Sequence, residues 1–131
     1  MFNIDHISIS VEHLQETLKF YNNFGFEIYK EYHDDSVDII MLKLDNIFLE
    51  IFHYNNCNSL PEHAQKLEKD LKTIGTKHFG LNVKNINEAK KWVEDKNLNN
   101  DELEIHQGRL GRPYFFIKDP NGILVEIIEE K

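Results

Sequence analysis

The sequence predicts an α+β protein built from two similar modules, each with the order strand, helix, strand, strand, strand. Short segments in which apolar and polar residues alternate predict half-buried strands, and two longer segments have the apolar spacing of an amphipathic helix. The third observation is an internal repeat, because the second half of the chain restarts the pattern of the first. Helices combined with mostly sequential strands are typical of sheets that helices cover on one face.

The first module is expected over about residues 1–54. Its first strand is the alternating segment 3–11, and a helix follows between 11 and 23, with apolar residues four and then three positions apart. Gly25 is a helix stop. Three further strands follow, separated by turn residues: 26–32, 37–44 and 47–54.

A linker over about residues 55–76 contains a predicted helix at 62–71. The second module covers about residues 77–131, and the two modules together form a single domain. The predicted elements of the second module are one helix, 86–95, and four strands, 77–83, 103–106, 114–118 and 123–128. The sequence Asp119-Pro120-Asn121-Gly122 predicts the last turn.

A histidine and a glutamate recur in the same order in both modules. His6 and His78 are 72 residues apart, and Glu50 and Glu126 are 76 residues apart. The residues around them match as well, with an aliphatic residue three positions, a valine five positions and an aromatic residue fourteen positions after each His. Each His begins one predicted strand and each Glu lies within another. The repeat therefore predicts one metal site made by two modules.

The neighbours of these four residues support a functional role. Because side chains two positions apart share a face of a strand, His6 lies with Ser8 and Ser10, which are small enough to leave space for a cavity. Glu50 and Glu126 lie among apolar side chains, where a carboxylate is costly to bury unless it meets a proton, a cation or a metal. Two such acids at matching positions favour the metal interpretation.

Composition disfavours several function classes. The formal net charge of −8 argues against a nucleic-acid or anionic-membrane surface, so a small molecule is the expected partner. Cys57 is the only cysteine, so no internal disulfide can form. The sequence has neither a signal-peptide pattern nor a long apolar segment, and we expect a soluble, cytoplasmic protein.

Four stretches of the chain fit a known pattern: Ile4–Val11, Phe20-Tyr21 before Gly25-Phe26-Glu27, Lys77–Val83 and Phe116–Glu126. With them the chain resembles the vicinal oxygen chelate superfamily, which includes glyoxalase I, extradiol dioxygenases, fosfomycin-modifying enzymes and bleomycin-binding proteins. The resemblance covers nearly the whole chain and is most specific at the Asp-Pro-Asn-Gly turn before the last strand. It implies two tandem βαβββ modules that form a curled mixed sheet around a metal cavity, and a homodimer.

The resemblance implies metal ligands at His6, Glu50, His78 and Glu126. This two-His, two-Glu set is similar to that of glyoxalase I, and it suits one divalent ion per site: Ni, Zn, Co, Fe or Mn. The implied activity is that of a lactoylglutathione lyase, which isomerises a 2-oxoaldehyde–thiol adduct through an enediolate. Glu126 or Glu50 is then the catalytic base, and the sequence leaves this choice open.

Two other activities of the superfamily stay open as alternatives. An antibiotic resistance protein would either bind a drug, which needs no ligand set, or transfer a thiol to an epoxide. An extradiol dioxygenase is less favoured, because oxygen and a catechol need open coordination positions that a fourth protein ligand would fill.

Substrate contacts are expected beside the metal ligands. Glutathione-using relatives have an Arg four residues after the first ligand His, and here that position is Ser10. Arg109 and Arg112, in a Gly-rich loop, could instead close over a bound anion. The other predicted substrate-binding residues are Phe48, Phe52, Asn82 and Tyr114. For the remaining histidines we expect surface roles: His13, His33, His53, His63 and His106.

Overall fold

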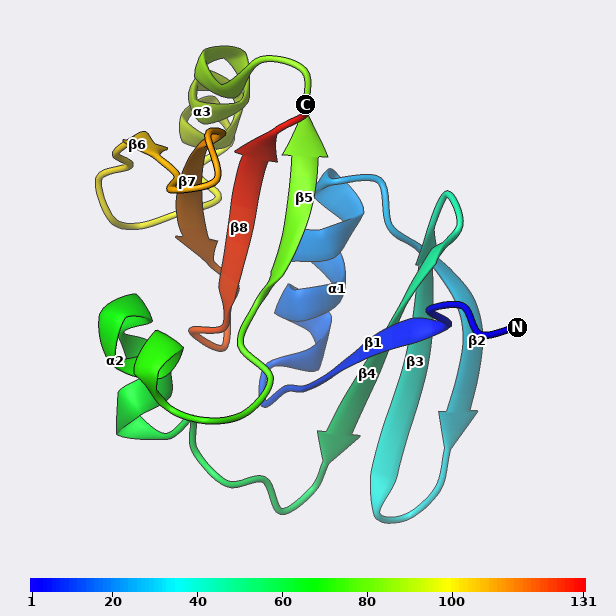
Figure 1. The fold of residues 1–131 in the computed structure, drawn as a ribbon. Helices are drawn as coiled ribbons and strands as arrows, with labels where there is room; N and C mark the ends of the chain where they lie inside the picture. The colour runs from blue at the N-terminus through cyan, green and yellow to red at the C-terminus, as the bar shows by residue number, and fades with distance from the viewer. The chain divides into compact units, whose positions relative to one another are not determined.

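The structure, a computed structural model, describes residues 1–131, which form two compact units, Met1–Ser59 and Leu60–Lys131. Each unit contains one four-stranded sheet that mixes parallel and antiparallel pairs (Figure 1). The predicted α+β class and the two tandem βαβββ modules are therefore confirmed. One predicted module lies in each unit.

The first unit has the strand order β1-β4-β3-β2. The edge strand β1 pairs in parallel with β4, whereas β4, β3 and β2 form antiparallel pairs. The elements of this unit are β1 (His6–Ser10), α1 (Leu14–Asn23), β2 (Glu27–His33), β3 (Val37–Leu44) and β4 (Ile47–Tyr54).

The second unit repeats this topology with the order β5-β8-β7-β6. Here the edge strand β5 pairs in parallel with β8, and helix α3 contacts β7 and β8. Its elements are the 3₁₀ helix η1 (Glu62–Gln65), α2 (Leu67–Lys72), β5 (Phe79–Val83), α3 (Ile86–Asp95), β6 (His106–Gln107), β7 (Pro113–Lys118) and β8 (Leu124–Glu129).

Burial alternates along β4 and β8, the strands that contain the two repeated glutamates. Leu49 and Ile51 are 1% and 0% exposed, so Glu50 between them projects from the opposite face of the sheet. Val125 and Ile127 flank Glu126 in the same way. The apolar alternation therefore determines the face on which each carboxylate lies.

The predicted turn before β8 is confirmed, and its side chains explain the motif. The buried Asp119 carboxylate accepts hydrogen bonds from the backbone N–H groups of Asn121 and Ile123, at 2.8 and 3.0 Å. Gly122 has φ +82°, a left-handed conformation that glycine adopts without steric cost. The turn thus fixes where β8 begins.

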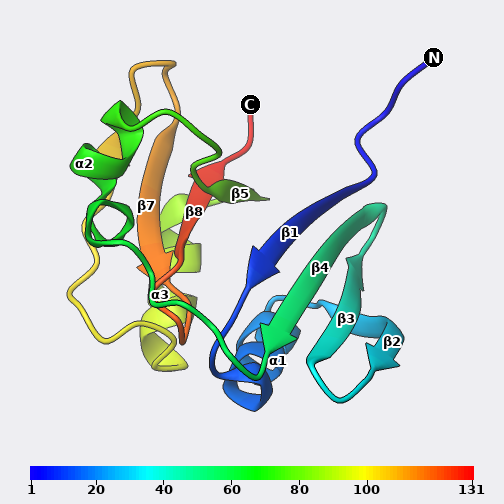
Figure 2. The same cartoon turned by 90° about the horizontal axis from the view of Figure 1, so that it is seen from below.

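Several element boundaries differ from the prediction, three of them for a visible structural reason. Strand β1 begins at His6 rather than at residue 3, and the preceding residues extend away from the sheet (Figure 2). The predicted linker helix is two short helices, because the backbone at Lys66 is extended, with φ −128° and ψ 120°. Strand β6 has only two residues, and Leu103 before it is buried outside any strand. The apolar side chain of Leu103 therefore reflects burial in the core rather than strand pairing.

We expect Ile51→Ala to lower the free energy of unfolding by about 2–5 kcal/mol, because the truncation leaves a cavity at a fully buried position. Urea denaturation measures this change. Ile47→Ala is the matched control, since Ile47 lies on the same strand but is 45% exposed, and it should cost much less. Equal losses in the two variants would contradict the assignment of the buried face.

Candidate metal centre

The pairing of β1 with β4 brings His6 and Glu50 together on one face of the first sheet. In this parallel pair Ser8 lies opposite Glu50, and His6 is two residues before Ser8 on the same face. The His6 Nε2 and Glu50 Oε1 atoms are 3.6 Å apart, and the side chains are 39% and 22% exposed. The pair is therefore partly shielded from water but open to a ligand.

The second unit contains the same arrangement. In the parallel pair of β5 with β8, Gly80 lies opposite Glu126, and His78 is two residues before Gly80. The His78 Nε2 and Glu126 Oε2 atoms are 3.3 Å apart, and the two side chains are 19% and 20% exposed. Each unit thus presents one imidazole and one carboxylate in matching register.

The surroundings of His6 define the state of its ring. Its Nδ1 atom is 2.7 Å from Asp5 Oδ2, so an Nδ1–H group can donate to this carboxylate and leave Nε2 facing Glu50. The hydrogen bond to Asp5 raises the pKa of His6 above its ordinary value of 6.5; desolvation opposes the rise, and the charge of Glu50 adds to it. Asp5 therefore orients the imidazole.

His78 is held by packing instead. Its ring meets the Phe116 ring edge-on, with centroids 4.7 Å apart and an interplanar angle of 90°. Its Nδ1 atom is buried and has no hydrogen-bond partner. Gly80 lies beside the carboxylate, and a Cβ atom there would meet Glu126 Oε2 at 3.4 Å, an ordinary van der Waals distance. The Nε2 atom, 3.3 Å from Glu126 Oε2, is therefore the ring nitrogen placed to bind a cation together with that carboxylate.

The donor atoms fit a first-row divalent metal, for which imidazole nitrogen and carboxylate oxygen are common ligands. No group of three or more His, Cys, Asp or Glu side chains that could hold a metal ion is present in the structure. Each pair alone supplies two ligands, fewer than the three or four of typical zinc sites. Neither pair by itself is a metal centre.

Comparison with known proteins identifies the family of the chain. A sequence profile described as Glyoxalase/Bleomycin resistance protein/Dioxygenase superfamily matches residues 3–127. The chain belongs to this superfamily. The resemblance inferred from the four segments is therefore confirmed.

Curated relatives of this superfamily member include two mitochondrial methylmalonyl-CoA epimerases. The protein from Dictyostelium discoideum is 29% identical over 98% of this chain and 78% of its own length. The one from Bos taurus is 28% identical over 95% and 72%. Among solved structures, a glyoxalase family protein from Enterococcus faecalis is 25% identical, with a TM-score of 0.79 and 97% of each chain covered.

Three residues predicted to bind substrate, Ser10, Phe48 and Phe52, share the Glu50 face. In the β1–β4 register Phe48 lies opposite His6 and Phe52 lies opposite Ser10, so these side chains project on the same side as the His–Glu pair. The two Phe side chains are half-buried. They give the His6–Glu50 pair an apolar rim.

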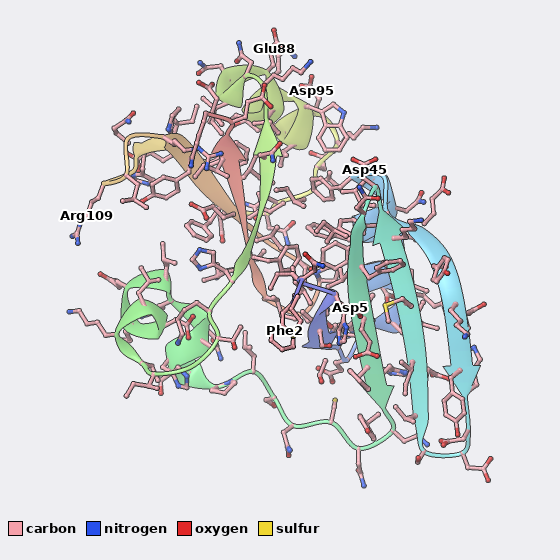
Figure 3. The ribbon with its side chains drawn as sticks, turned by 45° about the vertical axis from the view of Figure 1, so that its right-hand side comes forward. Phe2, Asp5, Asp45, Glu88, Asp95 and Arg109 are labelled. Carbon is pink, nitrogen blue, oxygen red and sulfur yellow. The ribbon has the colours of Figure 1, made fainter.

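The remaining predicted contacts come from the second unit. Asn82 and Tyr114 both lie opposite Ile128, two residues beyond Glu126 on its face. Arg112 donates from Nε to the backbone oxygen of Glu129 at 2.6 Å, so this nitrogen is already engaged. Arg109 projects from the outer end of the β6–β7 loop (Figure 3). Of the two arginines, Arg109 stays the better candidate for an anion.

Sequence reasoning missed three residues that support the pairs. Asp5 contacts His6, Phe116 contacts His78, and the Ser8 hydroxyl donates to Glu50 Oε1 at 2.8 Å. The alternation of β1 had placed Ser8 on the His6 face, and this was the only available signal for it. The contacts themselves depend on strand register, which the sequence does not state.

Two of the other histidines form a hydrogen-bonded cluster on the opposite face of the first sheet. His33 and His53 flank Asp38 on the neighbouring strands, and their Nδ1 atoms are 2.6 and 3.0 Å from its two carboxylate oxygens. The hydrogen bond to Asp38 raises the pKa of His33, and the bond from His33 lowers the pKa of Asp38. Facing away from Glu50, the cluster is separate from the candidate metal centre.

We expect Asp38→Asn to lower the pKa of His33 toward its ordinary value of 6.5, because the lost hydrogen bond is the main cause of the raised pKa. NMR titration of the imidazole protons measures this. Asp35→Asn, at the nearby turn, is the control and should leave the pKa of His33 unchanged. An unchanged value in Asp38→Asn would contradict the contact.

The same pair makes stability depend on pH. The raised pKa of His33 stabilises the fold fully below pH 6.5, and the effect is lost as pH rises through the folded-state pKa. The lowered pKa of Asp38 stabilises above pH 3.8, and the effect is lost as pH falls through its folded-state value. The free energy of unfolding of wild type should therefore exceed that of Asp38→Asn by the largest amount between about pH 4 and 6.5. Urea denaturation at a series of pH values measures this difference. An advantage that grows at alkaline pH would contradict this.

Proposed function

We propose that the protein is a divalent-metal-dependent enzyme that moves a carbon-bound proton next to a carbonyl group. The observation that supports this most is the matched pairing of His6 with Glu50 and of His78 with Glu126, in the same register on equivalent strands. Two unrelated surface ion pairs would have no reason to share this register. Membership of a superfamily that includes enzymes adds to the case.

The four side chains together would hold one divalent ion, with both imidazole Nε2 atoms and one oxygen of each carboxylate as donors. When bound, the ion would supply positive charge that stabilises negative charge developing on the substrate as the proton leaves carbon. The same ligands serve Ni, Zn, Co, Fe and Mn, so the proposal does not depend on which of these is bound.

The two carboxylates are the proposed bases. One of them, Glu50 or Glu126, takes the proton from the carbon beside the carbonyl, and the electron pair of that C–H bond remains on the substrate. The proton then returns from a carboxyl group to carbon. Return to the adjacent carbon isomerises the substrate, whereas return to the other side of the same carbon inverts its configuration. Phe48, Phe52 and Phe116 would limit the access of water to this exchange.

Two substrate classes follow from two separate observations. The curated relatives are named methylmalonyl-CoA epimerase, which supports inversion at the acidic carbon of an acyl thioester. The filled two-His, two-Glu set supports isomerisation of a thiol–oxoaldehyde adduct, as in glyoxalase I. Ser10 stands where glutathione-using enzymes have an Arg, so glutathione itself is the less favoured thiol.

The other two activities fit the chain less well. A drug-binding protein would not need two His–Glu pairs, and an extradiol dioxygenase would need more open positions on the metal.

A homodimer stays a prediction. None of the helices has both the length and the apolar composition that crossing a bilayer requires.

We expect the metal-loaded protein to exchange the proton on carbon of at least one substrate class in deuterated water. The assays are deuterium incorporation into methylmalonyl-CoA and thioester formation from methylglyoxal with several thiols. Glu126→Gln should slow whichever reaction is observed by about 10²-fold or more, because it removes either the base or a metal ligand while keeping the size of the side chain. Glu130→Gln, at an exposed position just after β8, should retain activity.

The assays distinguish the candidate activities. Deuterium incorporation with inversion would establish the epimerase, and lactoyl thioester formation would establish the glyoxalase I-type enzyme. A metal-loaded protein that leaves both substrates unchanged would contradict both assignments.

A further inference from the structure

The two His–Glu pairs match in their donor atoms but differ in what supports the carboxylate. The Ser8 hydroxyl donates a hydrogen bond of 2.8 Å to Glu50 Oε1. At the equivalent position of the second unit stands Gly80, which has no side chain. The repeat is therefore asymmetric at one hydrogen bond.

The position of Ser8 suits it to fix Glu50. The two residues are direct partners in the β1–β4 register, so the backbone pairing on both sides sets the distance between them. A free Glu side chain samples many rotamers, and a ligand that must be ordered on binding loses conformational entropy. A hydroxyl donor that orders Glu50 beforehand removes part of that cost.

The second unit lacks this device although it has the space for one. A Cβ atom at Gly80 would lie 3.4 Å from Glu126 Oε2 and 3.7 Å from Glu126 Cβ, which are ordinary or nearly ordinary contacts. The φ angle of Gly80 is not in the left-handed region, so the backbone does not require glycine. Glu126 therefore lacks the hydroxyl hydrogen bond that orders Glu50.

The first pair is also supported on its histidine. Asp5 Oδ2 is 2.7 Å from His6 Nδ1, whereas His78 Nδ1 has no partner. Partners of this kind set the orientation of metal ligands and commonly change metal affinity by about 10- to 100-fold. Both supports thus belong to the first unit.

We propose that Ser8 is a positioning residue, whose hydroxyl holds the Glu50 carboxylate in its metal-binding orientation. The first His–Glu pair is then preorganised, and the second adapts around the ion. This inference rests on the proposed function, because it assigns Glu50 to a metal, and it goes further by naming the residue that orients that ligand.

The first test is metal affinity, measured by competition with a chelating indicator for Zn²⁺ and Co²⁺. Ser8→Ala should weaken binding by about tenfold. Ser8→Thr, which keeps the hydroxyl on a strand residue, should restore it, and Ser59→Ala, at an exposed position away from the sheets, should leave it unchanged. The visible spectrum of the Co²⁺ form should change in Ser8→Ala. Wild-type affinity in Ser8→Ala would overturn the inference.

The second test needs no metal and separates this inference from the proposed function. Crystal structures of the metal-free proteins should show Glu50 in one conformer in wild type and in several in Ser8→Ala. If wild type bound no metal, the proposed function would fail, and the Glu50 conformers would still decide the role of Ser8. One identical conformer in both proteins would overturn that role. Matching thermal unfolding of the two metal-free proteins would exclude a folding defect as the cause.

Discussion

The parallel pairing of the first and last strands in each unit determines the geometry of the candidate metal centre. In β1–β4 and in β5–β8 the residue two positions after the His lies opposite the Glu. A shift of one residue in either pair would move every side chain of that strand to the other face. The His–Glu pairs therefore exist only in the observed register, and the buried aliphatic residues beside each Glu stabilise it.

This constraint explains how a carboxylate comes to lie in a mostly apolar strand. Glu50 is flanked by Leu49 and Ile51, which the core buries almost completely, and the alternation of the strand turns the acid away from them. Its surroundings are then partly shielded but contain an imidazole and a hydroxyl. In this setting the carboxylate is satisfied by polar groups, and it remains accessible to a cation or to the proton of a substrate.

The fold could be predicted, and the four residues proposed as ligands could be selected, because both depend on local periodicity and on an internal repeat that are visible in one sequence. The contacts that support these residues could not be predicted from the sequence. Ser8 meets Glu50 across 42 positions of the chain, and Arg112 reaches the backbone of Glu129 across 17. Leu103 looked like a strand residue since burial alone also selects leucine. Register and tertiary contact determine these features, and neither has a local signature.

Equilibrium titration of the metal-free protein with Zn²⁺, followed by calorimetry, tests most directly whether the two pairs form one site. The expected stoichiometry is one ion per chain, and His6→Ala and His78→Ala should each abolish tight binding, because every ligand serves the same ion. Two ions per chain, or a variant of one pair that leaves tight binding to the other intact, would show that the pairs are independent and would contradict the shared metal centre.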